Sequence, residues 1–134
     1  MEINYLFVII AGIVYFAGGA LWYSPLLFGK SWMKEIGLTQ EDIKDHKSGV
    51  WKSYLIALIA QLFISYGLAR LMVYVDVTTI ADLLHMVFWS WLTFVVTTSA
   101  INGTFAGKSL KLWAIDNGYH LYGFFAAGLI LSLG

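Results

Sequence analysis

Long runs of apolar residues alternate along the chain with shorter polar segments. A helix that spans a membrane needs about 20 consecutive residues, most of them apolar. Four runs meet this requirement, at residues 3–22, 54–75, 83–101 and 112–133. Only a short segment separates the second run from the third, so these two are expected to form an antiparallel helical hairpin. The pattern therefore predicts an all-α fold, an integral membrane four-helix bundle formed by a single domain, 1–134.

The first connection, residues 23–53, is long and carries a helical pattern of its own. Ser24 before Pro25 is typical of a helix start, because the serine can cap the first turn and the proline needs no N–H there. Apolar side chains then recur at helical spacing opposite lysines, and a glycine follows that can end the helix. The apolar positions are Phe28, Trp32 and Ile36, the lysines are Lys30 and Lys34, and the glycine is Gly37. This pattern predicts an amphipathic helix on the inner membrane surface.

Beyond this helix, Thr39 and Asp42 have the spacing of a capping box, which predicts a second, polar helical turn over TQEDIKDHK. Two roles of the whole connection stay open at this point. It either anchors the first helical hairpin at the membrane surface or offers a binding surface to a partner.

Composition supports the membrane interpretation. Hydrophobic residues make up 60% of the chain and charged residues 12%, with a mean hydropathy of +0.76. Soluble domains carry about 25% charged residues, and a single core of this size could not bury so much apolar surface. The net charge is zero, which gives no reason to expect nucleic acid as a partner. The sequence has no cysteine, which excludes disulfides, thiolate metal sites and cysteine nucleophiles.

Basic residues indicate the orientation, because lysine and arginine are enriched in cytoplasmic connections. Most of the basic residues lie in or beside the first and third connections: Lys30, Lys34, Lys44, Lys47, Lys52, Lys108 and Lys111. We therefore expect a multi-pass membrane protein. Both of these connections would face the cytoplasm, and both termini would lie outside it.

Polar side chains inside the predicted spans are the candidate functional residues, because such groups are costly in lipid and often mark a site. Asp116 and His120 are four residues apart and are therefore neighbours on one helix face. Polar residues of the second and third spans fall at similar depths in the membrane. The predicted polar layer comprises Gln61, Thr93, Thr97, Asp116, Asn117 and His120.

Two interpretations of this layer stay open. In the functional one, Asp116 and His120 exchange protons or hold a small cation inside the bundle. In the structural one, the two residues hydrogen-bond to each other, to Tyr119 or to the threonine hydroxyls, and so fix the register of the helices.

A second polar cluster is expected near the outer surface, where Arg70, Asp82 and His85 fall at similar depths. Asp82 is placed to cap the third helix, and the long side chain of Arg70 can reach the membrane surface. An anion or a metal could bind there, but Asp82 and His85 offer only two metal ligands. We therefore expect no metal site and no cofactor.

Two stretches of the sequence are distinctive: GALWYSPLLFGKSWMKEIGLT at 19–39 and LKLWAIDNGYHL at 110–121. Together they resemble the bacterial family called domain-of-unknown-function 1761, and the resemblance extends over nearly the whole chain. Its most specific part is the junction motif, Trp22, Tyr23, Ser24, Pro25, Phe28, Gly29 and Lys30. In the second stretch, Asn117, Tyr119 and His120 fit the family pattern. The resemblance implies a small membrane protein with four spans, located in the bacterial inner (plasma) membrane, and brings no activity with it.

Three classes of function are compatible with these observations. The first is a small transporter or channel that handles protons or a small cation through Asp116 and His120. A homo-oligomer is then expected, because four packed helices leave no wide pore. The second is a non-catalytic scaffold that binds other membrane proteins or lipids of the bilayer. The third, an intramembrane enzyme, is not expected, since an aspartate and a histidine on one helix do not form a catalytic triad.

Overall fold

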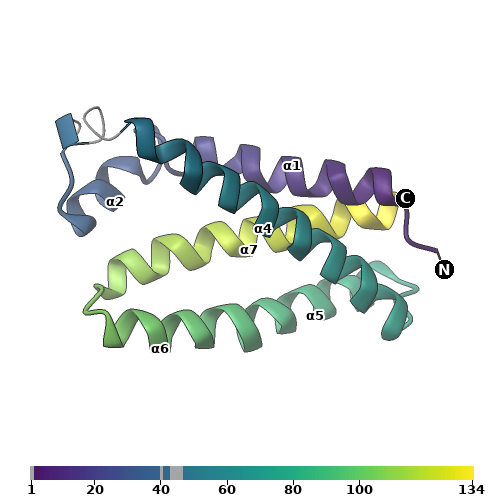
Figure 1. Ribbon diagram of the computed structural model, residues 1–134. Helices are drawn as coiled ribbons and strands as arrows, with labels where there is room; N and C mark the ends of the chain where they lie inside the picture. The colour runs from purple at the N-terminus through teal and green to yellow at the C-terminus, as the bar shows by residue number, and fades with distance from the viewer. Residues whose placement is uncertain (1, 40, 43–46) are drawn as a thin grey trace.

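The computed structural model describes residues 2–39, 41–42 and 47–134, and within these residues the chain is helical and has no strand (Figure 1). The helices are α1 (Tyr5–Trp22), α2 (Gly29–Ile36), α4 (Lys47–Tyr74), α5 (Ile80–Ser90), the π-helix η1 (Trp91–Val96), α6 (Thr97–Phe105) and α7 (Leu110–Leu133). Several begin with a side-chain cap: Asn4 for α1, Thr79 for α5 and Ser109 for α7. The prediction of an all-α fold is confirmed.

The elements α5, η1 and α6 follow one another without a break and form one continuous helix. The junctions keep a right-handed helical backbone, as at Trp91, where φ is −62° and ψ is −50°. In a π-helix, hydrogen bonds join residues five apart instead of four, which widens the turn. The π segment therefore changes which side chains of this helix face the rest of the bundle.

Three helices, not four, are long and apolar enough to cross a membrane in the described part of the chain: Tyr5–Trp22, Val50–Tyr74 and Ile80–Phe105. The prediction of a fourth apolar span over 112–133 is therefore not confirmed. The helix itself is present, because α7 has 24 residues. Its apolar content falls short because Asp116, Asn117 and His120 interrupt it.

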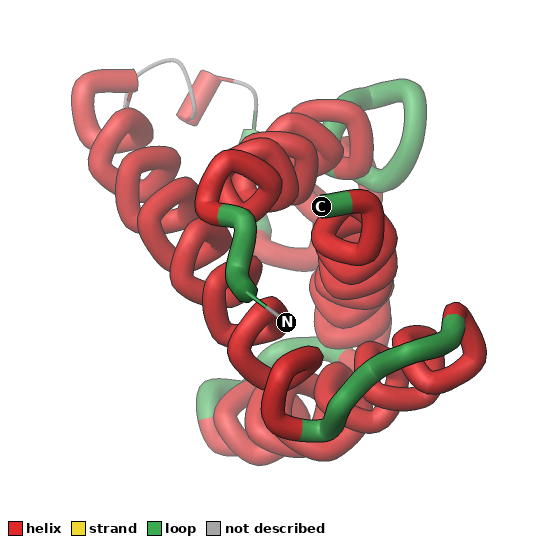
Figure 2. Tube along the Cα trace, turned by 90° about the vertical axis from the view of Figure 1, so that its right-hand side faces the viewer, coloured by secondary structure: helices red, strands yellow, loops and turns green. Residues whose placement is uncertain are grey.

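The helix α7 packs against α1, α4, α5, η1, α6 and α2, and its C-terminal end lies beside α1 at the end of the bundle that carries both termini (Figure 2). It carries more buried residues than any other helix of the described chain. The helix that carries Asp116, Asn117 and His120 is thus the most buried helix of the described chain. This arrangement turns polar side chains of α7 toward protein, which is where membrane proteins tolerate them.

Small residues let the helices approach one another closely. A Cβ atom added at Gly12 of α1 would lie 2.6 Å from Leu62 Cδ2 of α4. A Cβ atom added at Gly128 of α7 would lie 2.8 Å from Val87 Cγ2 of α5. Neither position has room for a side chain, and such close backbone approach is typical of packed membrane helices.

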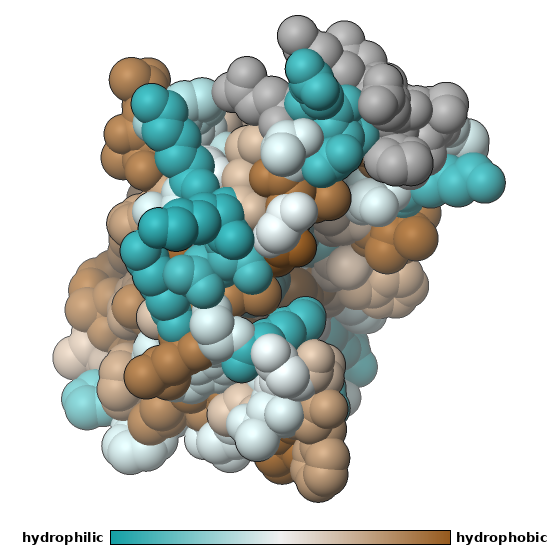
Figure 3. Space-filling view, turned by 90° about the vertical axis from the view of Figure 1, so that its left-hand side faces the viewer, coloured by the Kyte–Doolittle hydropathy of each residue, from teal (hydrophilic) through white to brown (hydrophobic). Residues whose placement is uncertain are grey.

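Both chain termini lie at one end of the bundle, and the connections after α1 and after α6 lie at the other end (Figure 1). Hydrophilic side chains gather on the end with the connections (Figure 3). Its exposed lysines include Lys30, Lys34, Lys108 and Lys111. Lys44 and the side chain of Lys47 lie outside the described part of the chain. The basic connections and the termini are therefore separated by the length of the bundle.

The predicted amphipathic helix corresponds to α2, but α2 begins at Gly29 and not at Ser24. The Ser24 hydroxyl donates to Leu21 O at 2.7 Å instead of capping a new helix. The Ser24 carbonyl accepts from Gly29 N at 2.9 Å, which closes a turn between the two helices. Ser24 and Pro25 thus belong to the turn that reverses the chain after α1, and the next helix starts only after this turn. The predicted end is confirmed, since Gly37 has the left-handed φ of 76°.

The helix α2 is held against the start of α7. Ser109 Oγ donates to Glu35 Oε2 at 2.6 Å and accepts from Leu112 N at 3.1 Å, so the cap of α7 also binds α2. Past α2, Thr39 and Asp42 form the predicted capping box, in which each backbone N–H bonds to the other side chain. The rest of the predicted polar turn lies partly outside the described residues.

Candidate functional site

The two sequence stretches that are distinctive in this chain meet in space. Trp22 and Tyr23, at the end of α1, contact the first half of α7. Trp22 Nε1 donates to Ile115 O at 3.0 Å, and Tyr23 OH donates to Asp116 Oδ1 at 2.6 Å. The junction motif therefore positions the polar segment of α7.

Tyr23 is enclosed by aromatic rings as well as by Asp116. The centroid of its ring lies 5.6 Å from that of Trp32 on α2 and 5.4 Å from that of Tyr119 on α7. Burial and the hydrogen bond to Asp116 raise the pKa of the Tyr23 phenol, which lies just past the end of α1. The phenol therefore keeps its proton and acts as the donor in this pair.

The other residues of the junction motif build the turn that places Trp22 and Tyr23. A Cβ atom at Gly29 would lie 2.7 Å from the Ser24 carbonyl carbon, so a side chain does not fit beside this turn. The ring centroids of Trp22 and Phe28 are 4.7 Å apart. The remaining motif residues, which are exposed, are Pro25 and Lys30. The motif thus forms a turn that places the Trp22 indole and the Tyr23 phenol against α7.

Near the middle of the bundle, a second tyrosine of α1 binds the histidine of α7. Tyr15 OH and His120 Nδ1 share a hydrogen bond. Tyr15 has no exposed surface, and its ring lies across Gly123, where a Cβ atom would overlap it. The tautomer of His120 decides which of the two groups donates.

A third tyrosine joins three helices. Gln61 Nε2 of α4 donates to Tyr119 OH at 2.9 Å, and Tyr119 OH donates to Tyr15 O at 2.6 Å. Ser65 Oγ donates to Gln61 O at 2.9 Å. The Tyr119 ring lies 5.4 Å from the Tyr15 ring and 5.4 Å from the Tyr23 ring. We call these connected side chains the tyrosine network: Tyr15, Tyr23, Gln61, Asp116, Tyr119 and His120.

Asn117 lies on a different side of α7 and binds the continuous third helix. Asn117 Nδ2 donates to Trp113 O at 2.8 Å. Ser99 Oγ lies 3.0 Å from Asn117 Oδ1 and 3.1 Å from Val96 O of its own helix, so its one hydrogen is shared between these two acceptors. Trp91 Nε1 donates to Asn117 O at 3.0 Å. In a regular α-helix, residues eight apart differ in direction by about 80°. The intervening π segment reduces this angle and lets Trp91 and Ser99 reach the same residue.

The structure brings together only part of the predicted polar layer. Gln61, Asp116 and His120 belong to the tyrosine network, but no hydrogen bond or ion pair joins Asp116 to His120 in the described chain. Asp116 bonds to Tyr23 instead, and His120 bonds to Tyr15. Thr93 and Thr97 do not join the layer, because both are exposed. The Thr97 hydroxyl bonds to the Thr93 carbonyl of its own helix, a common alternative for threonine.

The predicted outer cluster is not assembled either. Arg70 Nη2 donates to Tyr74 OH at 2.9 Å on its own helix. Thr79, not Asp82, caps α5, and its hydroxyl accepts from Asp82 N at 3.1 Å. His85 is exposed, and no hydrogen bond or ion pair joins Arg70, Asp82 and His85 in the residues that the structure describes. Those residues also contain no group of three or more His, Asp or Glu side chains placed to hold a metal.

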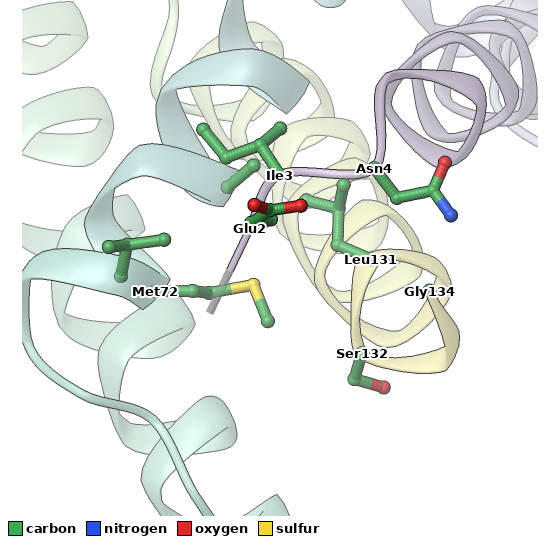
Figure 4. Close-up of a pocket in the computed structure, with 9 residues that line it drawn as sticks. Glu2, Ile3, Asn4, Met72, Leu131, Ser132 and Gly134 are labelled. Atoms are coloured by element: carbon green, nitrogen blue, oxygen red, sulfur yellow. The ribbon is translucent and has the colours of Figure 1, made fainter.

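A pocket of about 80 Å³ lies at the end of the bundle that carries the termini (Figure 4). The segment before α1 passes between α4 and α7 there, with Glu2, Ile3 and Asn4 beside Met72 and Leu131. None of the residues of the tyrosine network lines this pocket. The chemistry-bearing side chains and the pocket are therefore separate features of the bundle.

The sequence pattern did not identify the tyrosine partners of Asp116 and His120. One signal for them exists, since Tyr15 lies in the middle of an apolar span and a buried phenol usually finds a hydrogen-bond partner. The role of Ser99 had no such signal, because Thr93, Thr97 and Ser99 are similar in chemistry and only the rotation of the helix distinguishes them.

Comparison with known proteins identifies the family. No curated protein and no solved structure matches this chain. The family described as "Protein of unknown function (DUF1761)" matches residues 6–132, a range that contains the junction motif and all six residues of the tyrosine network. The chain therefore belongs to the DUF1761 family.

Proposed function

We propose that this protein is a small transporter or channel of the bacterial inner membrane that handles protons, or a small cation, through the tyrosine network. In this proposal α7 is the fourth span, enclosed by the three apolar helices, and both termini lie outside the cytoplasm. The observation that carries the proposal is the hydrogen bond between Tyr15 and His120 near the middle of the bundle. No enzymatic activity is proposed.

The chemistry of this pair suits a proton better than a larger solute. Imidazole can accept a proton at one nitrogen and release one from the other, and a phenol can both donate and accept. His120 uses Nδ1 for Tyr15, which leaves Nε2 for an exchange partner. The side chains around the pair are packed and bonded to one another, as in the contact of Tyr119 with Tyr15.

Asp116 supplies a second protonatable group on the same helix. It precedes His120 by four residues, which corresponds to about 6 Å along the helix axis. Because α7 starts at the end with the basic connections, Asp116 lies nearer that end than His120 does. A proton that passes between the middle of the bundle and the cytoplasm would therefore meet His120 and Asp116 in turn, each held by one tyrosine.

A homo-oligomer is part of the proposal. The exposed hydroxyl-bearing residues Thr93 and Thr97 lie on the continuous third helix, at positions that would otherwise face lipid. A second copy packed on this helix would cover them, and small polar residues are common between membrane helices.

The alternative function is a non-catalytic scaffold for other membrane proteins or lipids. Its supporting observation is the large apolar surface of α4 and of the continuous third helix. Phe63 and Phe94 have 72% and 68% of their surface exposed. A partner with an apolar membrane-spanning helix could pack on these rings as well as lipid does.

The test is proton and monovalent-cation flux into liposomes that contain the purified protein. Asp116→Asn and His120→Ala are compared with the parent after both are shown to fold equally well. Gly67→Ala is the matched control, because Gly67 lies at membrane depth on α4, outside the network. Apart from its chain neighbours and its own helix backbone, no heavy atom of the described residues lies within 4 Å of a Cβ atom there. Flux that both network variants abolish and Gly67→Ala retains is the expected result. No flux under any gradient would overturn the transport proposal, and a defined co-purifying membrane protein would then favour the scaffold.

A further inference from the structure

The side-chain amide of Gln61 has one polar atom, Oε1, without a hydrogen-bond partner among the described residues. The residue is only 5% exposed and lies near the middle of α4. Its Nε2 donates to Tyr119 OH, but its Oε1 is buried and has no hydrogen-bond donor among the described residues. A buried acceptor without a donor loses the hydrogen bond that it makes in water, which is unfavourable, so a ligand that donates a hydrogen bond to Oε1 would stabilise the protein.

The orientation of the Gln61 amide follows from its neighbour. Tyr119 OH has a single hydrogen, and it donates that hydrogen to Tyr15 O at 2.6 Å. The phenol oxygen can therefore only accept from Gln61, which requires the NH₂ group on that side. Exchanging the two ends of the amide would leave two acceptors facing each other, so Oε1 is the atom without a partner.

The donors closest to Gln61 in the chain and in the network are already engaged. The Ser65 hydroxyl, one turn further along α4, donates to the backbone carbonyl of Gln61. The Tyr15 phenol is bonded to His120 Nδ1, and no hydrogen bond joins it to Gln61 Oε1 among the described residues. A metal cation would need several oxygen ligands, whereas Gln61 Oε1 offers one. The chemistry of this site is that of a single small hydrogen-bond donor.

We propose that Gln61 Oε1 binds a water molecule inside the tyrosine network. This inference rests on the proposed function and deepens it, since a bound water supplies a mobile proton donor and acceptor beside the Tyr15–His120 pair. Buried water typically satisfies polar groups that the protein leaves unpaired. Gln61 then acts as a positioning residue, with one end holding Tyr119 and the other end holding the water.

The face of α4 that carries Gln61 leads toward the pocket at the end with the termini. Ser65 and Ala69 follow Gln61 at intervals of one turn on this face, and both are buried. Ala69 lines the pocket shown in Figure 4, about 12 Å along the helix from Gln61. The pocket volume of about 80 Å³ is ample for water. The two positions between Gln61 and the pocket on this face of α4 thus carry only a hydroxymethyl and a methyl group.

The sequence makes a direct test possible, because the chain contains only two glutamines, Gln40 and Gln61. Protein labelled with ¹⁵N in glutamine side chains is placed in phosphatidylcholine–phosphatidylglycerol bilayers, and solid-state NMR measures magnetisation transfer from water. Gln61→Met removes one of the two signals and so assigns them. Gln40 lies in the sequence between Thr39 and Glu41, which are exposed, and gives the reference signal.

The expected result is transfer from water to the Gln61 amide at the middle of the membrane. Transfer to Gln40 with none to Gln61 would overturn the water site. The measurement uses the unaltered protein and does not depend on flux. Transfer from water to Gln61 in a protein without flux would support the water site and refute only the transport function. A protein that conducts but shows no transfer to Gln61 would refute the water site and leave the transport function standing.

Discussion

Tyr15 and His120 are 105 positions apart in the chain, and their side chains share a hydrogen bond inside the bundle. To reach His120, the Tyr15 ring lies across the backbone of α7 at Gly123. Glycine one turn after the histidine is therefore a condition for the bond. The pair fixes both the rotation of α7 and its register against α1, independently of any part that it has in proton handling.

Gly123→Ala is expected to destabilise the protein by about 1–3 kcal/mol, the usual cost of overpacking a core. The new methyl group would overlap the Tyr15 ring and push it away from His120. Reversible unfolding in mild detergent measures the change in the free energy of unfolding.

The matched control is Gly67→Ala on α4. Apart from its two chain neighbours and its own helix backbone, no heavy atom of the described residues lies within 4 Å of a Cβ atom at Gly67. Because alanine favours helix over glycine by up to about 1 kcal/mol, this change is expected to be neutral or stabilising. Equal losses for both substitutions would show that the ring of Tyr15 does not pack against Gly123.

Tyr23→Phe is expected to lower the free energy of unfolding by about 1–2 kcal/mol, because the Asp116 carboxyl loses its donor. A double-mutant cycle with Asp116→Asn isolates the pair. The two losses should not add, since either substitution alone weakens the same hydrogen bond. Additive losses would mean that Tyr23 stabilises the protein only through its contacts with Trp32 and Tyr119.

Ser99→Ala is expected to cost about 0.6 kcal/mol, the average of hydrogen bonds between membrane helices. The Ser99 hydroxyl donates to Asn117 Oδ1 across the helix interface. Thr97→Ala, two residues earlier, should have a smaller effect, because its hydroxyl bonds only to the carbonyl of Thr93 on its own helix. The same unfolding assay checks both variants, and the opposite ranking would contradict the rotation that the π segment gives to this helix.

The crossing of the membrane by α7 can be tested by chemical labelling, since the natural chain has no cysteine. Lys108→Cys places a thiol before α7, and Ser132→Cys places one near its end. If α7 spans the bilayer, an impermeant maleimide added to intact cells should label Ser132→Cys and not Lys108→Cys. Thr78→Cys, between α4 and α5, is the reference and should behave as Ser132→Cys does.

A helix that does not cross would put residues 108 and 132 on the same side. The two variants would then be labelled alike, and the arrangement of four spans would be wrong even though the helix exists.

Much of the fold could be predicted from the sequence, because the length of an apolar run reports directly on a membrane helix. The first three predicted spans match helices of the structure. The fourth segment also forms a helix, but its polar residues reduce its apolar content below that of the others. The start of α2 was missed at Ser24, since a serine before a proline is typical both of a helix start and of a turn.

The site could be predicted only in part, for a physical reason. Polar residues inside spans are rare, which made Gln61, Asp116 and His120 recognisable. Their partners depend on how each helix is rotated about its axis, and a helix that is apolar on every side, such as α1, carries little information on that rotation. The phenol groups of Tyr15 and Tyr23 therefore became visible as partners only with the structure.

The packing of α7 against the helices that precede it in the chain has a consequence for biogenesis. The ribosome makes α1, α4 and the continuous third helix before α7, and each of those can enter the bilayer on its own apolar content. By the time Asp116 and His120 are synthesised, Tyr15 and Tyr23, which bind them, have already been made as part of α1 and its C-terminal cap. If α7 crosses the membrane as proposed, its insertion follows that of the helices that carry its hydrogen-bond partners and is a step of tertiary assembly.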